Sequence, residues 1–135
     1  MITERMVEEQ SVEEDLGGRA VSLEIPAEAH FLRLARLAAV DVGARAGLTV
    51  DETDDLRIAV DELCYALLGG ASRVTLKYRV AEDAVRIDGS SDGDRVEPAN
   101  DVTRAILAAV VDECEISSAD GRPRFRASKR IPSAG

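Results

Sequence analysis

The chain has 135 residues, of which 45% are hydrophobic and 32% charged, and its formal net charge is -9. This length fits a single domain with one core, and an aromatic content of 3% means that the core is built from small aliphatic side chains. The acidic balance argues against a protein that binds nucleic acid directly, because phosphate binding needs a cationic face. It suits a basic protein partner, or it only keeps the protein in solution.

Residues 1–18 are the first segment of the chain. They contain six acids, with only Arg5 as a base up to residue 16, and they end at Gly17-Gly18. Charge repulsion and a low apolar content predict a mobile acidic tail, either fully solvated or acting as a partner-binding arm. It has no apolar core of a signal peptide, and no apolar run approaches membrane-spanning length. Because Cys64 and Cys114 make no disulfide framework, we expect a cytoplasmic protein.

The first structured elements are a strand and a long helix. Residues 21–25 alternate between apolar and polar, which predicts a half-buried strand that Pro26 ends. A helix is expected from about residue 27 to 45. Its predicted buried stripe consists of Phe31, Leu34, Ala35, Ala38 and Val42.

Arg33 and Arg36 fall on the opposite side of this helix, with Val40 between them. An apolar spot flanked by two arginines is a candidate protein-binding surface, since arginine is favoured at interfaces. Ordinary exposed arginines explain the same pattern, and these residues alone do not separate the two interpretations.

The next helix is the central element of the chain. Thr49 and Glu52 have the spacing of a capping box, and Gly69-Gly70 supplies a stop. Apolar residues recur at three- and four-residue steps between them: Leu56, Ala59, Val60, Leu63 and Leu67. Glu62 lies at the edge of this stripe, where its carboxylate either points into a pocket or is solvated.

Hairpins make up most of the second half. Residues 73–80 alternate strongly, a turn follows at Glu82-Asp83, and Val85 begins a second strand. The loop at residues 88–94 is rich in small and acidic residues but lacks the spacing of a calcium-binding EF-hand loop.

A third helix is expected after a cap at Asn100 or Asp101, with an apolar face of Val102, Ile106, Ala109 and Val110. Residues 114–118 and the segment around Phe125 and Ala127 form the last two strands. A row of basic residues projects from the other side of the final strand: Arg122, Arg124, Arg126 and Arg130. This row either blunts edge pairing or meets an acidic partner.

The element order predicts an α/β (α+β) two-layer sandwich. We expect a mixed, mainly antiparallel sheet of about five strands, with three helices on one face. No metal-ligand set can be assembled, because His30 is the only histidine and the cysteines lack CxxC spacing. There is no Walker loop and no GxGxxG motif.

Three stretches resemble a known family: "VSLEIPA", "HFLRLARLAAVDVGARAGL" and "DDLRIAVDELCYALL". They are similar to the anti-sigma-factor serine kinases, and most similar to their divergent actinobacterial type. That family belongs to the ATPase superfamily of histidine kinases, heat-shock protein 90 and gyrase B, which share the Bergerat fold. The resemblance covers roughly residues 19–131. It implies a degenerate ATPase domain between the acidic tail and a short tail at residues 132–135.

The resemblance implies roles for individual residues. Glu62 matches the family's general base, but Ala66 stands where the family has the asparagine that holds magnesium on ATP. Asp88, Asp92 and Gly93 are approximate substitutes for the nucleotide-binding Asp-x-Gly-x-Gly motif. The family's phosphate lid is rich in glycine, whereas residues 94–100 contain none. Kinase activity is therefore expected to be absent or very weak, because magnesium neutralises the developing charge in phosphoryl transfer. We expect no cofactor, with ATP and magnesium as the alternative.

The chain matches the family's partner-binding residues better than it matches the nucleotide-binding ones. Phe31-Leu32-Arg33 matches a Phe-x-Arg pattern whose arginine contacts the sigma factor and its antagonist, and Arg36 lies beside it. The resemblance therefore implies an anti-sigma factor that sequesters an alternative sigma factor and is released by an anti-anti-sigma (STAS-domain) protein. A homodimer is implied in the same way. The alternatives are an active serine kinase and a scaffold in another signalling assembly.

Overall fold

The computed structural model describes residues 20–132. The predicted acidic tail and residues 133–135 lie outside this range. The elements in chain order are β1 (Ala20–Pro26), a 3-10 turn (Ala29–Phe31), α2 (Leu32–Ala46), α3 (Val50–Tyr65), β2 (Arg73–Val80), β3 (Ala84–Ser91), α4 (Asp101–Val110), β4 (Glu113–Ala119) and β5 (Arg122–Arg130).

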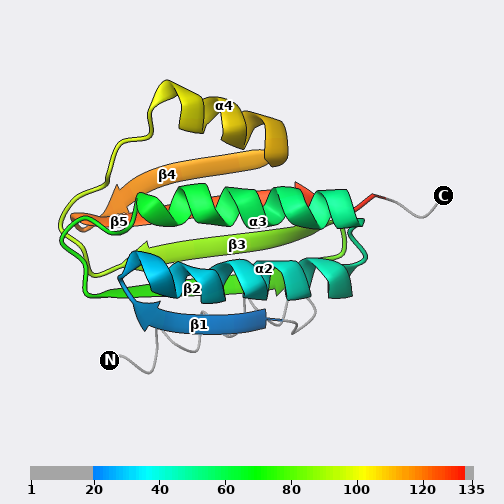
Figure 1. Ribbon diagram of the computed structural model, residues 1–135, viewed down its shortest axis with the longest axis horizontal. Coiled ribbons are helices and arrows are strands. Elements are labelled where there is room, and N and C mark those ends of the chain that lie inside the picture. Colours follow the sequence, from blue (N-terminus) through cyan, green and yellow to red (C-terminus); the bar gives the residue numbers. More distant parts are fainter. Residues whose placement is uncertain (1–19, 133–135) are drawn as a thin grey trace.

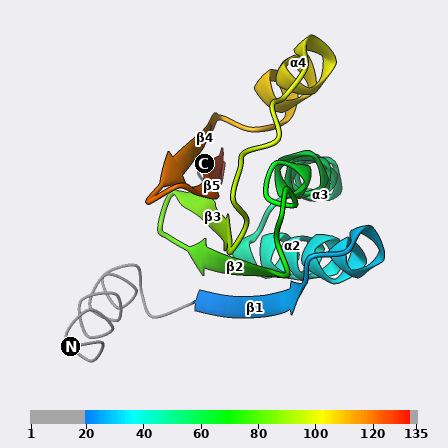
Figure 2. The ribbon, with the colours of Figure 1, turned by 90° about the vertical axis from the view of Figure 1, so that its left-hand side faces the viewer.

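The five strands form one sheet in the order β1-β2-β3-β5-β4, and each neighbouring pair is antiparallel. The three α-helices lie together on one face of this sheet (Figures 1 and 2). The predicted two-layer sandwich is therefore confirmed. None of the helices between residues 20 and 132 has the length and apolar character that a membrane span requires.

The central helix forms where the capping box predicts it. The backbone N–H of Glu52 donates to Thr49 Oγ1 over 3.1 Å, and the backbone N–H of Thr49 donates to Glu52 Oε1 over 2.8 Å. Two otherwise unpaired donors at the helix start are satisfied in this way. The predicted stripe from Leu56 to Leu67 is completely buried against the sheet, so α3 is confirmed as the centre of the core.

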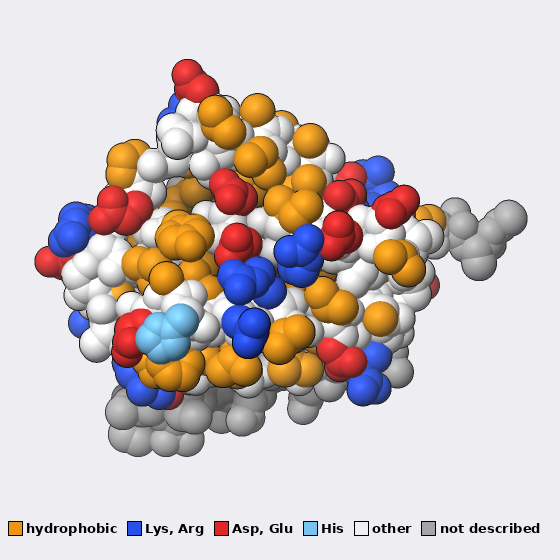
Figure 3. Space-filling view, viewed as in Figure 1, with side chains coloured by type: hydrophobic (Ala, Val, Ile, Leu, Met, Phe, Trp, Pro, Cys, Tyr) orange, Lys and Arg blue, Asp and Glu red, His pale blue; other side chains and the backbone are white. Residues whose placement is uncertain are grey.

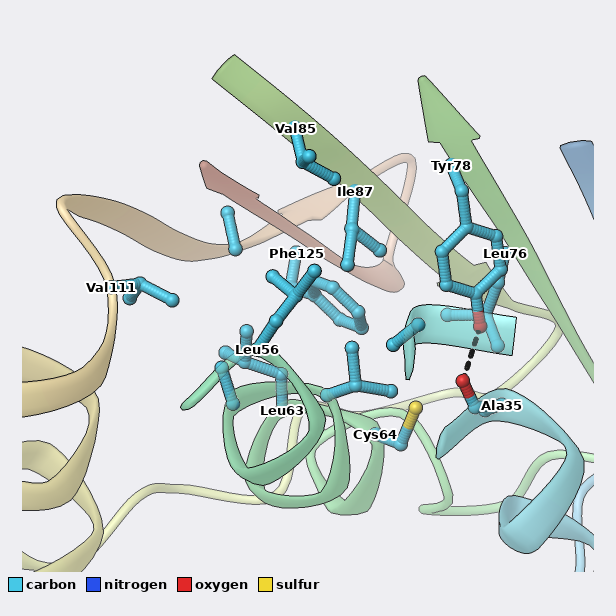
Figure 4. Close-up of a cluster of buried hydrophobic side chains, with 14 of the residues drawn as sticks. Ala35, Leu56, Leu63, Cys64, Leu76, Tyr78, Val85, Ile87, Val111 and Phe125 are labelled. Atoms are coloured by element: carbon cyan, nitrogen blue, oxygen red, sulfur yellow. Dashed lines mark hydrogen bonds between the residues drawn. The ribbon is translucent and has the colours of Figure 1, made fainter. Parts of the chain in front are cut away.

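Few aromatic side chains enter this core, and one of them, Tyr78, has a polar hydroxyl group. The hydroxyl of Tyr78, on β2, donates to the carbonyl oxygen of Ala35, on α2, over 2.8 Å (Figure 4). Tyr78 is fully buried, and burial raises the pKa of its hydroxyl well above the ordinary value. This bond fixes α2 to the sheet, because a buried hydroxyl without a partner would be costly.

The buried faces of the two outer helices differ from the prediction. In α2, Leu32 and Ala39 are buried while Leu34 is 45% exposed, because packing on the sheet selects a second apolar stripe of the helix: Leu32, Ala35, Ala39 and Val42. In α4, Val102 is 67% exposed and only Leu107 and Val110 are buried. Thus only the C-terminal half of α4 packs into the core.

Candidate functional site

Glu62 and Ala66 lie one helical turn apart at the C-terminal end of α3. The side chain of Glu62 is half-buried, and within residues 20–132 it makes no hydrogen bond or ion pair. Ala66 is the C-cap residue and is 4% exposed. Its methyl group carries no atom that could ligate a metal ion.

The segment that follows β3 packs against this end of α3. The backbone N–H of Glu97 donates to the carbonyl oxygen of Ala66 over 3.2 Å, and that of Asp94 donates to Gly69 over 3.1 Å. A Cβ atom on Gly69 would lie 2.8 Å from the side chains of Arg95 and Glu97. The chain's own residues 94–97 therefore fill the space beside Ala66.

Ser91 and Gly93 also hold this segment against the end of α3, through hydrogen bonds and a close backbone contact. The Ser91 hydroxyl donates to the carbonyl oxygen of Leu67 over 2.7 Å and accepts from the backbone N–H of Gly93 over 3.1 Å. A Cβ atom on Gly93 would collide with the carbonyl oxygen of Gly69. The glycine at position 93 thus permits a close contact within the chain.

Asp92 holds the loop to the start of β2. Its carboxylate accepts from the backbone N–H of Ser72 over 2.8 Å, from the Ser72 hydroxyl over 2.5 Å, and from the backbone N–H of Arg73 over 3.0 Å. These hydrogen bonds, the one from the Ser72 side chain first, lower the pKa of Asp92 to about 2. This carboxylate therefore serves to hold two segments of the chain together.

Asp88 lies on the other face of the sheet. It alternates along β3 with Ile87, which is buried under the helices, so its carboxylate points away from them. There it pairs with Arg79 at 2.7 Å and with Arg126 at 3.3 Å. The structure therefore does not bring Asp88 to Glu62, and the approximate nucleotide motif is divided between two faces.

An open hollow lies between the loop, α4 and β4, with a volume of about 470 Å³. Its lining consists of Val96, Glu97, Pro98, Ala99, Arg104, Leu107, Ala108, Cys114 and Ile116, and Glu62 is not part of it. The described residues contain no group of three or more histidine, cysteine or acidic side chains that could hold a metal ion. Glu62, the predicted base, therefore neither lines this hollow nor lies beside a metal-binding group of the described residues.

The predicted partner-binding residues lie at the start of α2. Arg33 is exposed, and Phe31 is half-buried, with its ring centroid 4.5 Å from that of His30. Arg36 is not free: its Nη1 atom lies 2.6 Å from Asp61 Oδ1 on α3. This pair is about one-third exposed, so Arg36 joins the two helices and presents only part of its side chain to solvent.

Exposed apolar side chains surround these arginines. Leu34 is 45% exposed and Leu37 is 57% exposed, and both lie on α2. Figure 3 shows basic side chains gathered near the middle of the helix face with hydrophobic side chains around them. Sequence reasoning missed Leu37 and Asp61. The three-residue spacing of Leu34 and Leu37 was an available signal, whereas nothing local identifies Asp61 as the partner of Arg36.

The fold and the site together define a class: a two-layer α/β sandwich whose helix face carries an exposed arginine–leucine surface. No family model matches the chain. It is similar to the serine-protein kinase RsbW of Bacillus subtilis (strain 168), with 30% identity over 80 residues, covering 55% of this chain and 50% of that protein. The kinase of the same name from Listeria innocua is 29% identical over 79 residues, covering 54% of this chain and 50% of that protein.

This chain is thus a distant relative of these kinases over about half its length. It also spans only about half the length of the curated relatives it matches.

Proposed function

We propose that this protein is a cytoplasmic regulator that resembles the anti-sigma factors. It binds an alternative sigma factor through the helix face, and a STAS-domain anti-anti-sigma protein competes for the same surface. The similarity to serine-protein kinases named RsbW supports this kind of protein. The regulation is steric and follows mass action.

The observation that carries the proposal is the surface of Arg33, Leu34 and Leu37 on α2, called here the α2 surface. An exposed arginine next to exposed apolar side chains suits a protein interface, because arginine is enriched at interfaces and in their hot spots. The helix that presents them is rigid, since Tyr78 and the Arg36–Asp61 pair hold it to the sheet and to α3. A preorganised surface loses less conformational entropy on binding.

We also propose that phosphoryl transfer is absent. Such a reaction depends on positioning and on charge neutralisation by magnesium. Ala66 offers no ligand, and residues 94–97 fill the space beside it. The residues present therefore do not fit a nucleotide held by magnesium at this end of α3.

Co-purification with the sigma factors of the source cell tests the proposed partner. We expect one alternative sigma factor to be retained, and Arg33→Ala to weaken its binding at least ~10-fold, as for a hot-spot residue. Arg45→Ala is the matched control, because Arg45 is an exposed arginine of the same helix that pairs with Asp41 within α2. If no sigma factor is retained, or if Arg33→Ala binds like Arg45→Ala, the proposed surface is wrong.

The alternative function is an active serine kinase with Glu62 as general base. The names of the relatives favour it, and so does the half-buried Glu62 carboxylate, which has no partner within residues 20–132. Calorimetric titration with ATP and magnesium separates the two functions. If millimolar nucleotide gives no heat of binding, the kinase hypothesis is rejected. Binding together with phosphorylation that Glu62→Gln abolishes would establish it.

A further inference from the structure

The face of the sheet opposite the helices is basic, although the chain as a whole is acidic. Six side chains make up what we call the basic sheet face: Arg73, Lys77 and Arg79 on β2, and Arg122, Arg124 and Arg126 on β5. They alternate with residues buried under the helices, such as Leu76, Tyr78 and Phe125. No described element covers this face (Figure 2).

Several cations of this face already have partners. Glu24 pairs with Arg73 at 3.1 Å, Glu115 lies opposite Arg126, and Lys77 also has an interaction partner. Asp88 serves both Arg79 and Arg126. Within residues 20–132, Arg122 and Arg124 have no acidic partner at all. The positive charge without an acidic partner in the described part of the chain therefore lies at Arg122 and Arg124, at the start of β5.

Arg79 adds an independent observation. Its side chain is only 19% exposed, and its Nε atom is buried without a hydrogen-bond acceptor in the described part of the chain. A buried donor of this kind is costly unless an acceptor is supplied. Carboxylates are the acceptors that guanidinium groups bind most strongly.

The chain itself contains a segment with this chemistry. Residues 1–18 carry six acids and lead, through Arg19, into Ala20 at the start of β1. β1 is an edge strand and lies next to β2. Crossing the sheet from β1 to β4 takes roughly 20 Å, given a strand spacing of about 4.8 Å. An extended segment of this length reaches up to ~60 Å, so it can reach all of the basic sheet face.

We propose that residues 1–18 dock across the basic sheet face of the same chain. Their carboxylates neutralise Arg122 and Arg124 and supply an acceptor to Arg79. The α2 surface lies on the other face of the sheet and takes no part in this contact. This inference goes beyond the proposed function and stands independently of it.

A nitroxide spin label in the full chain tests the docking. Cys114→Ser removes the exposed thiol, Cys64 is buried, and Ser11→Cys places the label within the acidic segment. We expect the backbone amide signals of β2 and β5 to lose at least half their intensity in low salt, while those of α2 keep theirs. The loss should diminish at 0.5 M salt, because screening shortens the range of charge interactions. Equal loss over both faces, or none, overturns the proposal.

Variants that change only charges test the docking separately from the folding of the domain. Changing the six acids of residues 1–18 to their amides leaves the described domain untouched and should abolish the intensity loss. Arg122→Gln, Arg124→Gln and Arg126→Gln together should do the same. The matched control changes Arg45, Arg57 and Arg104, on the three helices, to glutamine and should retain the loss. Persistence of the loss in the amide variant overturns the proposal.

A mixed sample identifies which chain the segment binds. Isotope-labelled protein without the nitroxide is combined with unlabelled protein that carries it. Docking within one chain predicts no intensity loss in this mixture. Loss on β2 and β5 here means that a second copy supplies the segment, which contradicts docking within the same chain.

Discussion

Replacing Gly89 with alanine tests whether this glycine serves core packing. Gly89 on β3 is paired with Phe125 on β5, and the Phe125 ring lies over the glycine. A Cβ atom at position 89 would collide with the ring, with 2.7 Å to Cζ and 2.8 Å to Cδ2. Phe125 is 1% exposed, so the ring has no room to move away.

Two opposing effects set the magnitude. Overpacking a closed core costs about 1–3 kcal/mol. Alanine in place of glycine within a strand gains about 0.5–1 kcal/mol, because the unfolded chain loses freedom. The expected net loss is therefore about 0–2.5 kcal/mol, and about 1 kcal/mol at the midpoints of the two ranges. At about 4 °C per kcal/mol for a domain of this size, the Tm falls by about 5 °C at the midpoints.

The assay is thermal and urea unfolding of Gly89→Ala, Phe125→Leu and the double variant. Leucine lacks the ring atoms that the new methyl group meets, so the double variant should lose at least ~0.5 kcal/mol less than the sum of the single losses. Ser90→Ala, the next residue on β3, is the control and should change stability by less than ~0.5 kcal/mol. Strict additivity of the two single losses would refute the packing argument.

Three further outcomes follow from the described contacts. Asp61→Asn should cost about 0.5–1 kcal/mol in urea unfolding, with the smaller value in high salt, because its pair with Arg36 is one-third exposed. Asp92→Ala should flatten the loss of stability in acid, since a carboxyl whose folded pKa is lowered to about 2 stabilises above its ordinary value of 3.8 and loses this effect as the pH falls through about 2. A thiol reagent should modify Cys114 alone in the folded protein and both cysteines in denaturant, because Cys64 is buried and burial raises its thiol pKa to about 12.

Features set by neighbouring residues were predictable from the sequence. The capping box at Thr49, the hairpin of β2 and β3, and the outward row of arginines on β5 all depend on spacing within one segment. The buried face of α2 was not predictable, because the helix also has an apolar stripe of Leu32, Ala35, Ala39 and Val42, and only packing on the sheet selects it. This is why Leu34 is exposed.

The candidate site depended on contacts between distant segments. Arg36 and Asp61 are 25 positions apart, and only the packing of α2 on α3 brings them together. The attachment of Glu97 to Ala66 likewise follows from the path of the loop after β3. The resemblance directed attention to Ala66, but it could not show that residues 94–97 pack beside this residue.

Native mass spectrometry of this protein with the sigma factor, the STAS-domain antagonist and magnesium ATP separates regulation by binding from regulation by phosphorylation. We expect a complex with the sigma factor, its displacement by rising amounts of antagonist, and no mass change of the antagonist. Arg33→Ala should give less of the complex at the same concentrations. Failure to form the complex, or a phosphorylated antagonist, would contradict the claim of a regulator that acts by binding alone.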